Sequence, residues 1–89
     1  MYHIFFASTA RQDLRALEPS IAHRILKKLD FYLLQKNPLV FATRLTTPFL
    51  DRYRFRIGDY RAVFRVDSNE EIQILMILRI KHRKDIYLS

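Results

Sequence analysis

Residues 51–66, DRYRFRIGDYRAVFRV, decide the fold of this 89-residue chain. Polar and apolar side chains alternate along both halves of the stretch, and a period of two residues is typical of β-strands. The alternation pauses at Gly58-Asp59, where a glycine at the first central position suits a two-residue turn of type II′. The stretch is therefore predicted to form a β-hairpin.

The turn determines which residues of the hairpin lie opposite one another. It pairs Ile57 with Tyr60 and Arg56 with Arg61, and paired residues share a face of the sheet. One face is predicted to carry five arginines, Arg52, Arg54, Arg56, Arg61 and Arg65. The other face carries side chains that can cover a core, namely Tyr53, Phe55, Ile57, Tyr60, Ala62 and Phe64. Like charges directly opposite one another destabilise a sheet, so Arg56 opposite Arg61 indicates that this face binds an anion.

The composition describes one small, basic, folded domain spanning residues 1–89. Hydrophobic residues make up 49% of the chain and there is one glycine, which excludes an intrinsically disordered protein. Sixteen Lys and Arg against nine Asp and Glu give a formal charge of +7. This charge favours a nucleic acid or an acidic protein as partner, and the alternative is a basic surface that only confers solubility.

Several classes of site and location are excluded. The absence of cysteine rules out disulfides, a thiolate nucleophile and a cysteine-based zinc site. The carboxylates Asp59, Glu70, Glu71 and Asp85 do not form a cluster, so neither a metal nor a small-molecule cofactor is expected. The apolar start is too short for a secretory signal, and Ile72–Leu78 falls far short of the ~20 residues of a membrane span. A soluble, cytoplasmic protein with no membrane partner is expected.

The segments before the hairpin predict a strand and two helices. Residues 2–7 are aromatic and β-branched, which indicates a strand, and Thr9–Gln12 has the spacing of a capping box at the start of a short helix. Pro19 suits the first turn of a second helix, which should stop by Asn37. Its apolar stripe is Ile21, Ile25, Leu29 and Leu33, and its polar side, Arg24, Lys27 and Lys28, is expected to be solvated.

Residues 38–50 have no clear period and are predicted to be a loop. After the hairpin, residues 67–70 form a turn cluster, and residues 71–79 are predicted to be the third strand of an antiparallel meander. The turn does not fix the register of that strand. Pairing Phe64 with Ile74 is preferred, which directs a set of four side chains to the core: Ile72, Ile74, Met76 and Leu78. The predicted fold class is α+β, with an N-terminal strand, two helices and a three-stranded antiparallel meander.

Residues 81–87, KHRKDIY, form a second concentration of polar chemistry, which an antiparallel return can bring near Arg56 and Arg61. RNA carries its own nucleophile, the 2′-hydroxyl, so a protein needs only to position it, move protons and stabilise a dianionic phosphorane. Arginines suit the last task, and His82 and Tyr87 are candidate proton-transfer groups. The structural alternatives are an inert surface histidine, a tyrosine that packs on the sheet, and Arg52 or Arg65 paired with a neighbouring aspartate.

Two segments, YRFRIGDYR at 53–61 and HRKDIY at 82–87, carry a resemblance to the RelE/ParE superfamily of toxin-antitoxin toxins. The order of predicted elements and the opening, residues 4–7 through 13–17, are similar to that family as well. The resemblance implies a small microbial-RNase-like sheet packed on a helical pair, and a cognate antitoxin that wraps the toxin. In the RelE branch it implies cleavage of mRNA in the ribosomal A site by 2′-hydroxyl attack, which leaves a 2′,3′-cyclic phosphate.

The resemblance also implies residue roles. Arg61 matches the arginine that stabilises the scissile phosphate, Tyr87 matches a C-terminal proton-transfer tyrosine, and His82 or Arg83 matches the general acid position. The expected catalytic residues are Arg61, His82, Tyr87 and Arg56, and the expected RNA-binding residues are Arg54, Arg83, Lys81, Arg52 and Arg65. The sequence departs from the family pattern at Ile80-Lys81, where a glycine is common, and at residues 43–47, TRLTT, where a Lys-Leu-Lys-Gly-like segment is expected.

The sequence therefore predicts a metal-independent, ribosome-dependent mRNA endoribonuclease whose partners are an antitoxin, the ribosome and mRNA. Two alternatives stay open. One is a ParE-like, non-catalytic inhibitor of DNA gyrase on the same fold, and the other is an inactive RNA-binding relic.

Overall fold

The computed structural model describes residues 2–45, 52–69 and 71–86, with side chains as far as residue 84. The elements in chain order are β1 (Tyr2–Phe6), α1 (Ser8–Arg15), α2 (Pro19–Leu33), the 3₁₀ turn η1 (Pro38–Phe41), β2 (Ala42–Arg44), β3 (Arg52–Ile57), β4 (Tyr60–Asn69), β5 (Ile72–His82) and α3 (Arg83–Ile86). The predicted α+β class is confirmed. None of the helices within these ranges is long and apolar enough to cross a membrane.

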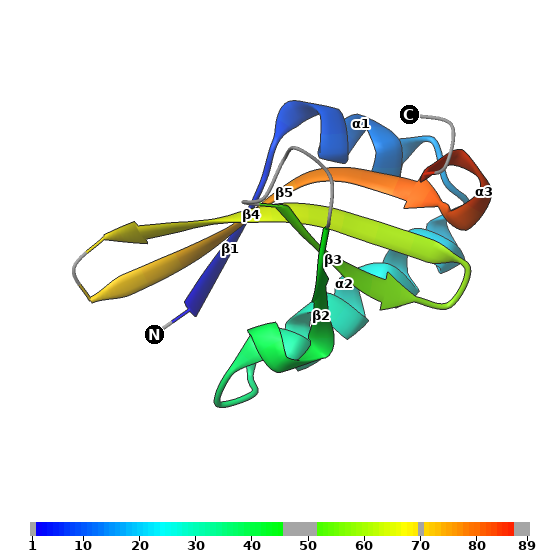
Figure 1. The fold of residues 1–89 in the computed structure, drawn as a ribbon. Helices are drawn as coiled ribbons and strands as arrows, with labels where there is room; N and C mark the ends of the chain where they lie inside the picture. The colour runs from blue at the N-terminus through cyan, green and yellow to red at the C-terminus, as the bar shows by residue number, and fades with distance from the viewer. Residues whose placement is uncertain (1, 46–51, 70, 87–89) are drawn as a thin grey trace.

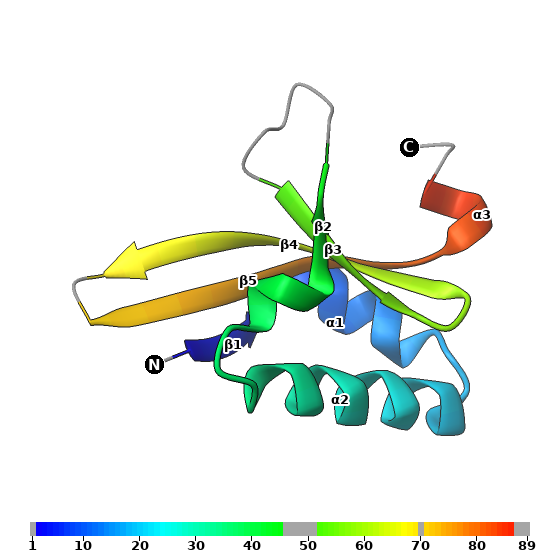
Figure 2. The same cartoon turned by 60° about the horizontal axis from the view of Figure 1, so that its bottom comes forward.

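A five-stranded mixed sheet in the order β1-β5-β4-β3-β2 organises the molecule (Figure 1). β1 runs parallel to β5, and the other neighbours are antiparallel. Helices α1 and α2 lie on the same side of the sheet, as Figure 2 shows, so neither of them covers the opposite face of β3 and β4. The core lies between α2 and the sheet, and its largest buried side chains include Ile25, Leu29, Phe55, Phe64 and Ile77.

The hairpin of β3 and β4 has the predicted register. Ile57 pairs with Tyr60, Arg56 with Arg61 and Arg52 with Arg65. Gly58 adopts a positive φ of 61°, which a two-residue hairpin turn requires at its first position. On the core face the rings of Phe55 and Phe64 stack at 4.5 Å between centroids, so the aromatic half of the alternation builds the wall of the core.

Two segments have more regular structure than predicted. The prediction of a loop at 38–50 missed η1 and the edge strand β2. β2 forms by pairing with β3, and this pairing is not visible in the local sequence. β4 continues through Asp67, Ser68 and Asn69, so the prediction of a turn cluster beginning at residue 67 was wrong. The arm formed by β4 and β5 extends past Arg52, the first residue of β3 (Figure 1).

The predicted register of β5 was also wrong. Phe64 pairs with Ile77 instead of Ile74, and β5 buries Leu75, Ile77 and Ile80 while Ile72 is 40% exposed. The physical reason is the close connection between β4 and β5: Asn69 pairs with Ile72, and the same register continues without a break to Phe64 and Ile77. A β-bulge then follows, because Val63 pairs with Arg79, so Leu78 has no partner of its own on β4. One extra residue switches which side chains face the core, and a single alternating pattern cannot describe this strand.

α1 covers the edge of β5 that β1 leaves open. β1 ends at Phe6, opposite Ile77, and the next exposed groups of β5 find partners on α1. The hydroxyl of Thr9 donates to the Leu78 carbonyl at 2.8 Å, and the Ile80 N–H donates to the Asp13 carboxylate at 2.9 Å. The predicted capping box was wrong, because α1 begins at Ser8 with no side-chain cap and Thr9 bonds to the sheet instead.

Candidate nucleic-acid interface

The face of the sheet opposite α1 and α2 brings three cations into one row. Arg56 on β3 pairs with Arg61 on β4, and Arg61 pairs with Lys81 on β5. Arg56 is exposed, Lys81 is half-buried, and Arg61 is only 7% exposed. We call Arg56, Arg61 and Lys81 the cationic row. It spans three strands and presents positive charge at the position where a phosphate group can lie across them.

Arg61 is held against the hairpin turn. Its Nη1 donates to the carbonyl of Gly58 at 3.3 Å and to the carbonyl of Tyr60 at 3.2 Å. These bonds fix the guanidinium beneath the turn, so Arg61 has a structural role as well as the anion-binding role that the sequence indicated. A side chain fixed in this way is a preorganised donor for an anion.

The other predicted RNA contacts lie further from the cationic row. Arg54 sits opposite Val63 and Thr43, and Arg52 sits opposite Arg65, toward the far end of β3. Arg65 forms an ion pair with Asp67, with 3.2 Å between Nε and Oδ2 and both side chains part-exposed. For Arg65 the structural alternative is therefore observed.

The C-terminal segment is brought back to the hairpin turn. The backbone N–H of Arg83 donates to the Asp59 carbonyl at 2.7 Å, and Nε of Arg83 lies 3.9 Å from the Asp59 carboxylate. In Figure 2, α3 stands on the side of the sheet away from α1 and α2. The segment that follows β5 therefore lies next to the cationic row, as the sequence predicted. Tyr87 lies outside the described residues.

His82 does not share a face with Arg61. It pairs with Tyr60, and the two rings meet edge-on with 5.2 Å between centroids. Because Tyr60 packs against the core, His82 occupies the alternate position of β5 from Lys81 of the cationic row. Its Nδ1 accepts a hydrogen bond from the Lys84 N–H at 3.2 Å, which caps the start of α3. His82 thus holds the segment that carries Arg83.

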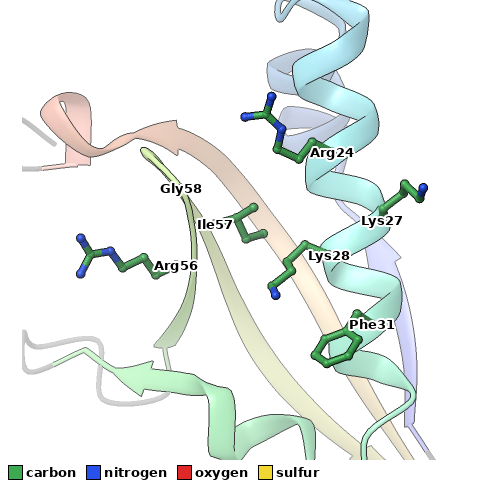
Figure 3. Close-up of a pocket in the computed structure, with 7 residues that line it drawn as sticks. All are labelled: Arg24, Lys27, Lys28, Phe31, Arg56, Ile57 and Gly58. Atoms are coloured by element: carbon green, nitrogen blue, oxygen red, sulfur yellow. The ribbon is translucent and has the colours of Figure 1, made fainter.

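A groove between α2 and the end of β3 was missed by the sequence prediction, which treated the polar side of α2 as solvated. The groove encloses about 460 Å³ and its lining residues are Arg24, Lys27, Lys28, Phe31, Arg56, Ile57 and Gly58 (Figure 3). The signal in the sequence was the spacing of Arg24, Lys28 and Phe31, which places them along one side of a helix.

A metal centre is absent from the part of the chain whose side chains are described, since it holds no group of three His, Cys, Asp or Glu that can bind an ion. The cationic row can bind an anion through the fixed guanidinium of Arg61 and the exposed side chain of Arg56. Phosphate is the ligand that a row of arginines fits best.

The family model described as ParE toxin of the type II toxin-antitoxin system, parDE, matches residues 4–87. Among curated proteins, the chain is similar to Toxin RelG of Mycobacterium tuberculosis. The two are 35% identical over 86 residues, which cover 97% of this chain and 95% of that protein.

Solved structures of toxin-antitoxin complexes are also similar to this chain. A chain of the RelBE2 toxin-antitoxin complex of Mycobacterium tuberculosis has a TM-score of 0.72 and 30% identity, covering 92% of this chain and 98% of its own. A chain of the archaeal RelE-RelB complex of Pyrococcus horikoshii has a TM-score of 0.68 and 29% identity, covering 92% and 94%. The intact E. coli RelBE complex is similar in fold, with a TM-score of 0.67 at 18% identity.

Proposed function

Because the chain belongs to the RelE/ParE superfamily of type II toxin-antitoxin toxins, we propose that it is a metal-independent, ribosome-dependent mRNA endoribonuclease neutralised by a cognate antitoxin. The observation that supports this activity best is the cationic row. It places the buried, turn-anchored Arg61 between Arg56 and Lys81 on an open face of the sheet.

The proposed reaction needs no nucleophile from the protein. The 2′-oxygen of the RNA attacks the adjacent phosphorus, the bond from phosphorus to the 5′-oxygen breaks, and a 2′,3′-cyclic phosphate remains. The proton of the 2′-hydroxyl passes to a base, and a proton is delivered to the departing 5′-oxygen. The protein contributes proton transfer and stabilisation of the dianionic phosphorane.

Arg61 and Arg56 would stabilise the phosphorane. Arg61 suits this role because two turn carbonyls orient its guanidinium before substrate arrives, and fixed donors need no reorganisation in the transition state. Arg56 is exposed at the neighbouring position and can close on the phosphate as RNA binds. Lys81, at the other end of the row, would bind a flanking phosphate.

Arg54 and Arg83 would hold backbone phosphates on either side of the scissile bond, with Arg52 and Arg65 further along β3 and β4. Phosphate contacts of this kind position a strand without reading its sequence. Near the cationic row this face carries Arg54, Val63 and Arg79, whereas the exposed ring of Phe5 lies at its far edge, on β1 opposite Met76. Presentation of the strand by the ribosome would supply the missing selectivity.

Proton transfer is assigned to Tyr87. The four residues 81–84, a few positions before it in the sequence, include three cations, Lys81, Arg83 and Lys84. His82, which caps α3 and meets the ring of Tyr60, is assigned a positioning role in place of the proton transfer that the sequence suggested. Through α3 it sets where Arg83 and the segment toward Tyr87 lie.

The test is primer extension on a reporter mRNA in a translating bacterial extract, with and without the purified protein. We expect cuts inside codons, in frame, that disappear when ribosomes are omitted. A control sample quenched with EDTA before the protein is added separates cleavage during translation from cleavage during work-up. Intact mRNA in an extract whose translation the protein has stopped would contradict the proposal.

Inhibition of DNA gyrase is the second candidate, and one observation favours it. The matching family model is that of ParE toxins, and the cationic row would then be a docking surface. Changed plasmid supercoiling in treated cells, together with intact transcripts, would establish this alternative.

A further inference from the structure

We propose that the groove between α2 and the end of β3 binds an amphipathic segment of the antitoxin. Acidic side chains of that segment lie over Arg24 and Lys28, and apolar side chains lie over Phe31 and Phe41. This inference takes its partner from the proposed function and adds the surface and the chemistry of the contact.

The charge of the groove is of one sign. Four of its lining residues are cations, Arg24, Lys27, Lys28 and Arg56, and no carboxylate is among them. Figure 3 shows the side chains of Arg24 and Lys28 pointing from α2 into the gap toward β3, whereas Lys27 and Arg56 point away from it. Two cations one helical turn apart, both directed into a groove, complement a pair of carboxylates on a partner.

The Lys28 ammonium is positioned by aromatic rings. Its Nζ lies 4.8 Å from the centroid of Phe31 and 5.3 Å from the centroid of Tyr32, which are cation–π distances. Tyr32 is itself fixed, because its ring stacks on the buried Phe55 at 4.6 Å. The charge is thus held at a defined position above an apolar floor, and less side-chain entropy is lost when a carboxylate binds.

The groove continues into an exposed apolar patch. Phe31 and Phe41 are 47% and 44% exposed, and their ring centroids lie 6.3 Å apart. Leu34, one turn beyond Phe31 on the helix, is 85% exposed, and Val40, next to Phe41, is 73% exposed. Apolar side chains gathered in this way on a small protein mark a site of interaction.

The combination of groove cations with an exposed apolar patch fits a protein segment better than RNA. Aromatic rings can stack bases, but the aliphatic side chains Leu34 and Val40 offer no stacking surface, and they gain from burial against apolar side chains. From Arg24 to Leu34 the helix rises about 15 Å. The partner segment therefore carries its acidic residues about 5 to 15 Å from its apolar ones, and their order fixes its direction along α2.

This surface shares only Arg56 with the cationic row. Ile57 points toward α2 and is buried, whereas the side chain of Arg56 points to the opposite side of β3 (Figure 3). A partner that contacts Arg24, Lys28 and Phe31 therefore meets side chains that a strand bound on the open face does not. Substitutions in the groove are expected to weaken neutralisation without weakening toxicity.

The experiment measures the affinity of the toxin for antitoxin purified from the natural complex, by titration calorimetry. The test variant is the double charge reversal Arg24→Glu/Lys28→Glu. The matched control is Arg11→Glu/Arg15→Glu, which makes the same change of charge at exposed positions of α1 outside the groove. Reversal in the groove should weaken binding about 100-fold, because like charges placed together in an interface cost several kcal/mol. The control should change it less than about 5-fold, as expected for rim charges.

The same variants are assayed for mRNA cleavage in the translating extract and for thermal unfolding. We expect cleavage to be retained. If the double variant unfolds, the neutral pair Arg24→Gln/Lys28→Gln replaces it, with an expected loss of about 10-fold in affinity. Unchanged antitoxin affinity in the folded variant would overturn the proposal, and so would lost cleavage with intact affinity, which would make the groove an RNA site. If the wild-type protein cuts no mRNA while groove variants lose antitoxin affinity, the groove assignment holds and the endoribonuclease proposal fails.

Discussion

Arg79 on β5 and Asp13 on α1 form a two-bond ion pair that joins the helix to the sheet across 66 residues of sequence. Nε of Arg79 lies 2.9 Å from one carboxylate oxygen and Nη2 lies 3.1 Å from the other. The first of these oxygens also accepts the Ile80 N–H. A single carboxylate therefore attaches α1 to the part of β5 that leads to His82 and α3.

Asp13→Ala should lower the free energy of unfolding by about 1–3 kcal/mol, because the backbone N–H of Ile80 loses its partner along with the charge-assisted bonds from Arg79. Urea titration followed by circular dichroism measures the change. The control is Gln12→Ala, an exposed neighbour on the same helix, with an expected effect within about 0.5 kcal/mol. Equal stability of Asp13→Ala and the control would contradict the role given to this carboxylate.

Stability should fall in acid through the same group. Burial of Asp13 acts to raise its pKa, but hydrogen bonds from Arg79 and the Ile80 N–H, with the charges of Arg79 and Lys81, hold that pKa below its ordinary value. A carboxylate with a lowered pKa in the folded state contributes stability above its unfolded pKa of about 4, and the contribution is lost as pH falls through the folded pKa. Melting temperatures between pH 7 and pH 2.5 should therefore drop more steeply below pH 4 for the wild type than for Asp13→Asn. Parallel curves would show that other carboxylates dominate.

Arg61→Ala should reduce mRNA cleavage about 10²- to 10³-fold, the usual effect of removing one preorganised donor from a developing anion. Primer extension over a time course gives the rate. Arg11→Ala is the control, because Arg11 is exposed on α1, on the other side of the sheet from the cationic row, and it should retain cleavage within about 3-fold. An Arg61→Ala protein that remains fully toxic would refute the assignment.

The sequence could not distinguish two roles for His82, positioning of α3 and proton transfer, and two substitutions of His82 separate them. Asparagine can accept the Lys84 N–H as an N-cap but cannot transfer a proton near neutral pH. A positioning role predicts that His82→Asn retains cleavage and its pH profile, whereas His82→Ala loses about 10-fold as α3 loses its cap. Equal, severe losses in both variants, with one limb of the pH profile removed, would instead make His82 a proton-transfer group.

The turn at Gly58 gives a prediction about stability alone. A Cβ added at this position meets no atom within 4 Å, so the cost of a substitution comes from its φ of 61°. Gly58→Ala should destabilise the hairpin by about 1–2 kcal/mol, and Gly58→Asn by less, because asparagine tolerates this conformation better. Unfolding titrations of the two variants test the order, and a more stable alanine variant would contradict it.

The sequence by itself determined the central hairpin, including the pairing of Arg56 with Arg61. This was possible because the turn at Gly58-Asp59 and the alternation of period two are local properties, written within one stretch of sixteen residues. The family could also be predicted, from the segments at 53–61 and 82–87, and with it the arginine face and the return of the C-terminal segment to the turn.

Only the tertiary structure decided the rest. The bulge opposite Val63 shifts the register of β5, and its cause is non-local, since this strand must satisfy β4 on one side and both β1 and α1 on the other. The same register directs His82 away from Arg61. The groove beside Lys28 depends on α2 meeting the end of β3, two elements separated by the whole of η1 and β2. A period in the sequence tells which side of an element is apolar, but the neighbours of that element are set by packing across the whole chain.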